Sequence, residues 1–230
     1  MHLGQRPAMT PASRVDHLVV AAHSLEQGAQ WCEAMLGVSP LAGGKHPLMG
    51  THNRVLRISG AQYRQAYLEI IAIDPEAPAP KHKRWFDLDD AAMQEALREQ
   101  PRLIHFVAQS ADAAACIEAL HGLAIERGPL VPAERGALRW KISIRPDGQR
   151  LFYGALPTLI QWDSAHPTDG MPDSGVALKS VRVSHPRSAG LHEAHAAIGL
   201  QGVAVAQGVP DVEATLATPR GDVVLHSKGL

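Results

Sequence analysis

The sequence predicts an α+β fold made of repeated βαβββ modules. Two apolar strands, each with a histidine near its centre, open segments of similar length: residues 14–22 hold His17, and residues 103–108 hold His105. An alanine-rich stretch of helical period follows each strand, and shorter apolar runs separated by glycine and proline turns come next. A third, shorter pass of the same order begins at Val176. The modules resemble one another in the order of their elements more than in the identity of their residues.

The first module is expected over residues 14–74. Residues 14–22 are mostly apolar, which predicts a strand buried on both faces. Ser24 is a suitable N-cap, and apolar residues recur at helical spacing until Gly37, so a helix is predicted between them. A stretch rich in glycine and proline, residues 38–53, leads into strands over 54–59 and 67–73.

A linker, a second module and a partial third module are expected after the first. Residues 75–100 contain several prolines and a basic run, and they are predicted to connect the modules with a short helix near 90–98. The second module covers residues 101–165 and the third covers residues 176–230. In the second module a strand at 103–108 and a helix at 111–120 are predicted, followed by strands near 130, at 138–144 and at 158–162. In the third, a strand at 178–183 and a helix at 189–198 are predicted, followed by strands at 203–207, 212–218 and 222–226.

Charge and composition narrow the classes of partner. The 22 basic residues nearly balance the 23 acidic ones, which excludes the strong field expected for nucleic acid or an anionic membrane surface, so a small-molecule partner is favoured. Met1–Ser13 lacks the apolar core of a secretory signal and no apolar run reaches membrane-spanning length, which predicts a cytoplasmic protein. Cys32 and Cys116 lie among alanine and leucine in predicted helices, where reduced core thiols are expected.

Five segments carry a resemblance to a known family. They are VDHLVVAAHSLEQGAQWCEAMLGVSP, GGKHPLMGTHNRVLRISG, YLEIIAIDPEAP, LIHFVAQ and LPTLIQWD, and they cover most of residues 14–165. In these segments the chain resembles the glyoxalase-like domain family of the vicinal oxygen chelate superfamily. The resemblance implies that two βαβββ modules pack side by side, that their sheets curl into an open cup, and that the first and last strands of each module supply ligands to a metal in the cup.

Carried over position by position, the resemblance implies a ligand set. His17 and Glu69 come from the first module and His105 from the second, with Gln161 as the fourth position. The neighbouring Trp162 cannot coordinate, so the register of that strand decides between three and four protein ligands. Imidazole and carboxylate donors together suit Zn, Fe, Mn or Ni. Taken singly, His17 could instead be an edge-strand histidine hydrogen-bonded to a neighbouring strand, and Glu69 a solvent-facing residue.

Two classes of function are compatible with these residues. The first is a metal-dependent enzyme of the lyase or isomerase type, in which the ion chelates adjacent oxygens of a small substrate. Glu69 could also act as general base if it leaves the metal. Extradiol dioxygenase chemistry is less favoured because the second module shows no clear histidine and tyrosine pair. The second is a metal-free protein that sequesters a small molecule in the same cup. A homodimer that uses the third module as its interface is compatible with either.

Further candidates lie around the expected cup. His52 and Asn53 are expected to contact substrate together with Trp162, and Lys45 or His46 could bind an anionic group. Aromatic residues that could line an apolar pocket are Trp85, Phe86, Trp140 and Trp162, although a core position is favoured for Trp140 and for Trp31.

Two C-terminal histidines raise the question of a second metal. His192 and His195 have the i, i+3 spacing of one helix face. An exposed polar face is the favoured interpretation, because no carboxylate and histidine pair on a strand is predicted to converge with them.

Overall fold

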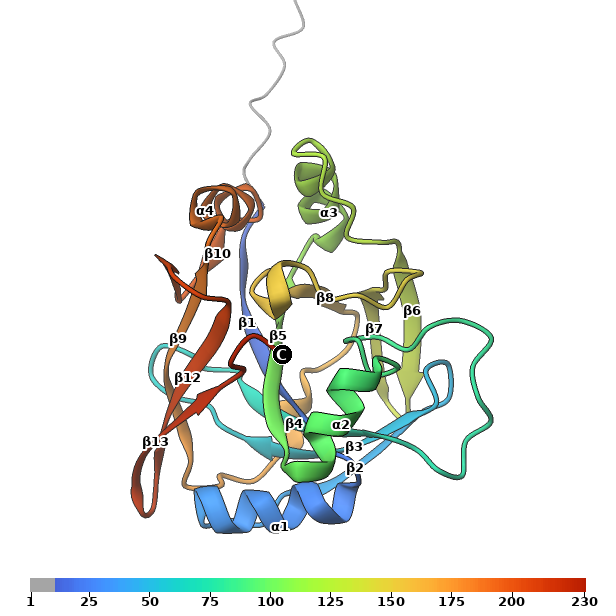
Figure 1. Ribbon diagram of the computed structural model, residues 1–230, viewed down its shortest axis with the longest axis vertical. Helices are drawn as coiled ribbons and strands as arrows, with labels where there is room; N and C mark the ends of the chain where they lie inside the picture. Colours follow the sequence, from blue (N-terminus) through green and yellow to red (C-terminus); the bar gives the residue numbers. More distant parts are fainter. Residues whose placement is uncertain (1–10) are drawn as a thin grey trace, which may run out of the picture.

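Residues 11–230 are described by the computed structural model of the protein (Figure 1), so most of the segment Met1–Ser13 lies outside the described part. The first βαβββ unit is formed by β1 (Ser13–Ala21), α1 (Leu25–Leu36), β2 (Leu41–His46), β3 (Thr51–Arg57) and β4 (Tyr67–Ile73). Helix α1 begins where the Ser24 side chain accepts a hydrogen bond from the backbone N–H of Gln27. It ends at Gly37, whose φ of 75° is the left-handed conformation that glycine adopts without strain.

The second unit repeats this order after a connection. The connection holds α2 (Ala91–Glu99), capped by the carboxylate of Asp90. The elements of the unit are β5 (Arg102–Ser110), α3 (Ala113–His121), β6 (Leu130–Arg135), β7 (Leu138–Ser143) and β8 (Thr158–Trp162). Asp112 caps α3 by accepting from the backbone N–H of Ala115. Two short 3₁₀ turns, Phe152–Gly154 and Pro167–Gly170, flank β8.

The two units share one curled sheet. Its strand order is β2-β3-β4-β1-β5-β8-β7-β6, with the first strands of the two units, β1 and β5, antiparallel at the centre. In each unit the last strand runs parallel to the first, β4 beside β1 and β8 beside β5. The sheet bends almost closed around a central space (Figure 1). One face of the centre strands from both units therefore looks into the same hollow.

A second, smaller sheet covers the outside of this one. It is built by β9 (Ala177–His185), β11 (Val203–Gln207), β12 (Asp211–Thr218) and β13 (Gly221–His226), in the order β11-β9-β12-β13. Helix α4 (Ser188–Ala197) precedes the short strand β10 (Leu200–Gln201), which pairs with β1 of the large sheet. Both β12 and β13 contact β5. A large apolar core joins the two sheets and helices, and a smaller one lies inside the cup around residues such as Val19, Ile71 and Phe86.

The predicted α+β class and the βαβββ cup are confirmed. The sequence missed β2, because its Leu41–His46 segment contains Gly43 and Gly44, which have no side chain to show strand periodicity. Pairing of β2 with β3 breaks register between Ala42 and Lys45, where these glycines lie. Among residues 11–230 no helix combines the length and the apolar character needed to cross a bilayer.

The structure refines one expectation about a side chain and overturns another. Trp140 is half-buried: it packs against the apolar core inside the cup, and it also lines a cavity there. His195 is buried, not exposed, because α4 turns this side chain inward, where its Nε2 donates to the carbonyl of Ala155 at 2.9 Å. His192 is exposed as expected.

Candidate functional site

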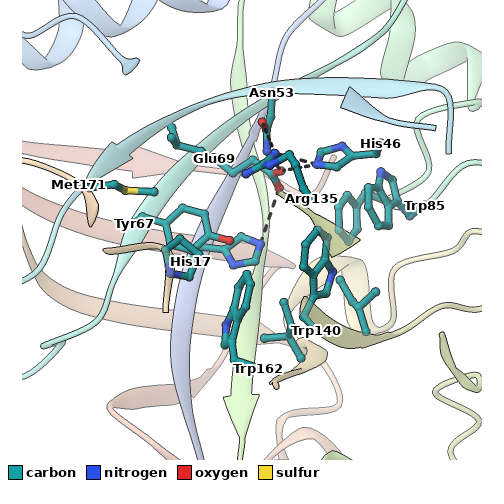
Figure 2. Close-up of a pocket in the computed structure, with 15 residues that line it drawn as sticks. His17, His46, Asn53, Tyr67, Glu69, Trp85, Arg135, Trp140, Trp162 and Met171 are labelled. Atoms are coloured by element: carbon teal, nitrogen blue, oxygen red, sulfur yellow. Dashed lines mark hydrogen bonds and ion pairs between the residues drawn. The ribbon is translucent and has the colours of Figure 1, made fainter. Parts of the chain in front are cut away.

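A cavity of about 40 Å³ opens inside the cup, where the two units face each other (Figure 2). The first unit contributes polar side chains from β1 to β4, and the second contributes mainly aromatic and aliphatic ones from β7 and β8. The lining residues are His17, His46, Asn53, Val55, Tyr67, Glu69, Trp85, Phe86, Arg135, Trp140, Ile142, Ile160, Trp162, Pro167 and Met171. A space of this size holds a few water molecules or an ion with part of its hydration shell.

A β-bulge in β1 sets the chemistry of the site. Val15 pairs with Ala108 and His17 with Val107, so Asp16 is an extra residue in this strand. Successive residues of a regular strand point to opposite faces, and a bulge redirects them. Here the bulge lets the Asp16 carboxylate reach the ring of the next residue: Asp16 Oδ1 lies 2.6 Å from His17 Nδ1.

Asp16 is a fully buried carboxylate with three donors. Its Oδ1 accepts from His17 Nδ1, and its Oδ2 accepts from Trp162 Nε1 at 2.9 Å and from His166 Nε2 at 3.0 Å. Burial alone would raise the pKa of Asp16, but the hydrogen bonds from His166 and His17 outweigh it and lower the pKa to about 2. Asp16 is therefore ionised at neutral pH, and each ring nitrogen that faces it carries a proton.

This arrangement orients His17. Because the Nδ1 proton is held by Asp16, the neutral imidazole has its lone pair on Nε2, the nitrogen that lies 3.6 Å from Glu69 Oε2. Tyr67 stacks on the ring with centroids 4.5 Å apart and fixes its plane. His17 thus presents an acceptor nitrogen to the cavity beside a carboxylate, which is the form in which histidine binds metals.

Glu69 is buried, so the alternative of a solvent-facing strand residue is wrong. Its Oε1 accepts from Asn53 Nδ2 at 2.6 Å and lies 3.8 Å from His46 Nε2. Asn53 is held in turn by the backbone N–H of Gly44, which donates to its Oδ1 at 2.8 Å. The Gly-rich strand that the sequence did not reveal is therefore what positions the partner of Glu69.

His46 is the second imidazole of the cavity. Burial lowers its pKa, although the nearby Glu69 carboxylate acts in the opposite direction. Its Nδ1 is 3.0 Å from Thr51 Oγ1, and its Nε2 faces Glu69 and Asn53. A neutral imidazole pointing at a carboxylate across the cavity can serve as a further metal donor.

Three residues of the predicted set do not join this cluster. Both ring nitrogens of His105 are engaged elsewhere: Nδ1 lies 2.8 Å from the Gly154 carbonyl, and Nε2 accepts from the backbone N–H of Thr158 at 3.1 Å. Gln161 faces α3, where its Oε1 accepts from the backbone N–H of Ala113 at 3.2 Å. His52 lies on the other face of β3, with Nδ1 3.9 Å from Asp74. The structure thus brings together His17, Glu69, Asn53 and Trp162 out of the residues expected at the site.

Sequence reasoning missed Asp16, His166, Tyr67 and Arg135. Asp16 directly precedes His17, which is a visible signal, but strand alternation would place the two side chains on opposite faces. His166 comes from a turn and Arg135 from the end of a hairpin. Nothing in their local sequence shows that His166 contacts Asp16 on β1 and that Arg135 contacts Asn53 on β3. Tyr67 reads as an ordinary strand residue.

Another group of donors lies outside the cup. Asp211, Glu213 and His226 place ligand-type atoms within 4.8 Å of one another on β12 and β13. Asp211 Oδ1 already accepts from the backbone N–H groups of Ser227 and Lys228, and its Oδ2 lies 2.7 Å from His226 Nδ1. These bonds fasten the end of the chain to β12.

Comparisons with known proteins agree with this architecture. The family model described as "Glyoxalase-like domain" matches residues 15–199. The structure is similar to that of a hypothetical protein from Staphylococcus aureus, with 13% identity, a TM-score of 0.59, and coverage of 86% of this chain and 87% of that chain. At this identity the likeness shows the fold alone.

Similarity extends to structures of methylmalonyl-CoA epimerase. The Mycobacterium tuberculosis enzyme has 14% identity, a TM-score of 0.42, and coverage of 73% of this chain and 97% of that chain. A Streptomyces coelicolor variant in complex with 2-nitronate-propionyl-CoA has 17% identity, a TM-score of 0.43, and coverage of 67% and 96%. No protein of curated function matches the chain.

Proposed function

This chain belongs to the glyoxalase-like domain family of the vicinal oxygen chelate superfamily, and from its site we propose that it is a metal-dependent enzyme of the lyase or isomerase type that acts on a small oxygen-bearing substrate. The observation that carries the proposal is the linked series Asp16, His17 and Glu69. A buried carboxylate holds the proton of one ring nitrogen, and the other nitrogen faces a second buried carboxylate in a cavity. Carboxylate, histidine and metal arranged in this order are common in protein metal sites.

The donors present fit a divalent ion such as Zn, Mn, Fe or Ni. His17 Nε2 and the Glu69 carboxylate, 3.6 Å apart, would hold it. His46 Nε2 lies 3.8 Å from the other Glu69 oxygen, but among residues 11–230 the only three donors that lie within 4.8 Å of one another are those of Asp211, Glu213 and His226, so His46 would have to move to become a third ligand. Open positions around such an ion are typical of catalytic sites. The Glu69 carboxylate and the Arg135 guanidinium line the cavity, and the ionised Asp16 carboxylate lies behind His17, so the two negative charges outnumber the positive one and favour a cation. When bound, the ion would polarise substrate oxygens as a Lewis acid.

The chain's own residues would perform the remaining work. Glu69 is also the proposed general base, in the case that its carboxylate leaves the ion: Asn53 holds one of its oxygens by a donated hydrogen bond, and the other faces the cavity. Trp85, Trp140 and Trp162 form apolar walls that limit access of water to the substrate. Asn53 and Trp162 line the cavity, which supports the proposal that they contact the substrate, whereas His52 lies on the other face of β3.

Metal titration tests the proposal. Protein purified without added metal would be analysed for metal content and then titrated with Zn²⁺ and Mn²⁺ by calorimetry. We expect one site per chain, strong weakening in His17→Ala and Glu69→Gln, and no change in the control His192→Ala, whose side chain is exposed on α4. Equal metal affinity in His17→Ala and the unaltered protein would contradict the proposal.

The same titration decides the two remaining ligand predictions. Gln161→Ala is expected to keep full metal affinity, because Gln161 faces α3. His105→Gln is expected to lower the thermal midpoint, since it removes a buried bond to Gly154 or Thr158, while keeping the metal stoichiometry.

A metal-free binding protein of the same fold is the second candidate. Its support is that the apolar walls dominate the cavity and that the fourth expected ligand faces elsewhere. Absence of stoichiometric Zn²⁺ or Mn²⁺ binding, together with unchanged ligand binding in His17→Ala, would favour this function.

A further inference from the structure

Arg135 lies over the candidate site without a carboxylate partner. It is the last residue of β6 in the second unit, and Figure 2 shows its side chain beside Asn53, His46 and Glu69 of the first unit. Its Nη1 is 3.5 Å from Asn53 Oδ1, a long hydrogen bond, and in residues 11–230 no Asp or Glu oxygen lies within 4.0 Å of the guanidinium. The side chain is half-buried at the cavity wall.

An arginine in this position is suited to a carboxylate ligand. Guanidinium donors form a rigid fork that matches the two oxygens of a carboxylate. Arg150 and Arg84, whose side chains are also little exposed, have such partners in Asp87 and Asp89, whereas the buried Arg127 donates to the Pro157 carbonyl and the Thr158 hydroxyl. Arg135 differs from them in that its unused donors face a cavity.

An apolar cavity adjoins the first one. It has a volume of about 50 Å³ and shares His46, Trp85, Trp140 and Ile142 with the candidate site. Its other walls are mainly apolar and come from the turn after β2 and from β6 and β7: Pro47, Leu48, Met49, Val131, Ala133 and Ile144. A molecule held at Arg135 could therefore extend an apolar group past Trp85 and Trp140.

We propose that the site takes small organic acids: Arg135 binds the carboxylate, an oxygen on the neighbouring carbon faces His17 and Glu69, and an apolar tail occupies the adjoining cavity. The inference rests on the proposed function for the role of His17 and Glu69. The Arg135 contact and the apolar cavity are independent of whether a metal is bound. The substrate class is thus 2-oxo or 2-hydroxy acids with a short branched or aromatic chain.

Calorimetric titration with 4-methyl-2-oxopentanoate tests the carboxylate contact. Binding of the acid would be measured with saturating Mn²⁺ and without added metal, and its uncharged methyl ester would serve as the control ligand. We expect the acid to bind about 10- to 100-fold more tightly than the ester, and Arg135→Gln to remove this preference. Arg139→Gln, on the exposed side of the same hairpin, is the matched control and should bind as the unaltered protein does.

The tail position has its own test. Ala133→Phe would fill the adjoining cavity from the edge strand β6 without removing any core side chain. The unaltered protein should prefer 4-methyl-2-oxopentanoate over pyruvate about 10-fold or more, because burying each additional methylene contributes about 0.8 kcal/mol, a factor of about four. The variant should bind both acids equally.

The outcomes separate this inference from the proposed function. Equal binding of acid and ester, an Arg135→Gln variant that keeps the preference, or no binding of the acid by the unaltered protein would each overturn the substrate class. Mn²⁺ titration of Arg135→Gln should show no loss of affinity, because Arg135 supplies no metal donor and its replacement removes a positive charge from the cavity wall. Acid binding without any metal binding would overturn the proposed enzyme and leave the Arg135 contact standing.

Discussion

Replacing Asp16 with asparagine tests how the site is organised. The carboxylate has no exposed surface and accepts from three side chains, those of His17, Trp162 and His166. Asparagine has the same shape but only one acceptor oxygen. If that oxygen faces Trp162 and His166, the amide NH₂ faces His17 Nδ1. The proton of His17 must then move to Nε2, the nitrogen that faces Glu69.

The effect on stability follows from the pKa. The ordinary aspartate pKa of 3.8 is lowered to about 2 at Asp16. One pKa unit corresponds to about 1.4 kcal/mol, so the ionised group contributes about 2.5 kcal/mol to the free energy of unfolding at pH 7. Because the folded pKa lies below the unfolded one, this contribution is complete well above pH 3.8 and is lost as the pH falls through 2. About 1 kcal/mol of it is lost by pH 3.

Two measurements check the Asp16→Asn variant. Denaturant unfolding at pH 7 should show a loss of about 2.5 kcal/mol, and the gap to the unaltered protein should narrow by about 1 kcal/mol at pH 3. Zn²⁺ titration should show affinity about 10- to 100-fold weaker, the usual effect of removing the partner of a ligating histidine.

A surface control separates this effect from simple loss of charge. Asp222→Asn removes a carboxylate that forms an exposed ion pair with Lys179, and its free energy of unfolding should change by at most about 0.5 kcal/mol. The reasoning is refuted if Asp16→Asn is as stable as this control at pH 7 and binds Zn²⁺ as tightly as the unaltered protein.

Three further outcomes are expected. Gly43→Ala should weaken Zn²⁺ binding measured by calorimetry, because a Cβ at Gly43 would overlap the side chain and the carbonyl of Asn53. The Asn53 side chain donates the hydrogen bond that holds Glu69, so unchanged affinity would show that Asn53 can shift freely. Burial lowers the pKa of His195 from 6.5 to about 4, so stability present above pH 6.5 should fall by about 3 kcal/mol as the pH drops towards 4, and unfolding curves of His195→Gln should lack this loss. Burial raises the pKa of Cys32 to about 12 and also raises that of Cys116, so a thiol reagent should label both only after unfolding; rapid labelling of the native protein would disprove their burial.

Much of the fold was predictable because its signals are local. Ser24 and Gly37 predict the two ends of the helix Leu25–Leu36, and both residues cap it as expected. The strands around His17 and His105 show as apolar runs because both of their faces are buried. The strand Leu41–His46 gave no such signal, since its glycines carry no side chain and its place at the sheet edge depends on pairing with β3.

The candidate site was also predictable only in part. His17 and Glu69 could be selected from the sequence as polar residues inside apolar strands, and the family resemblance implied that their strands would supply one site. Only the tertiary structure decided which face each donor takes. A one-residue bulge at Asp16 turns its carboxylate towards His17. In His105, by contrast, both ring nitrogens form hydrogen bonds, one with Gly154 and the other with Thr158. Strand register and bulges depend on partners far away in the chain, so they leave no mark on the sequence around these residues.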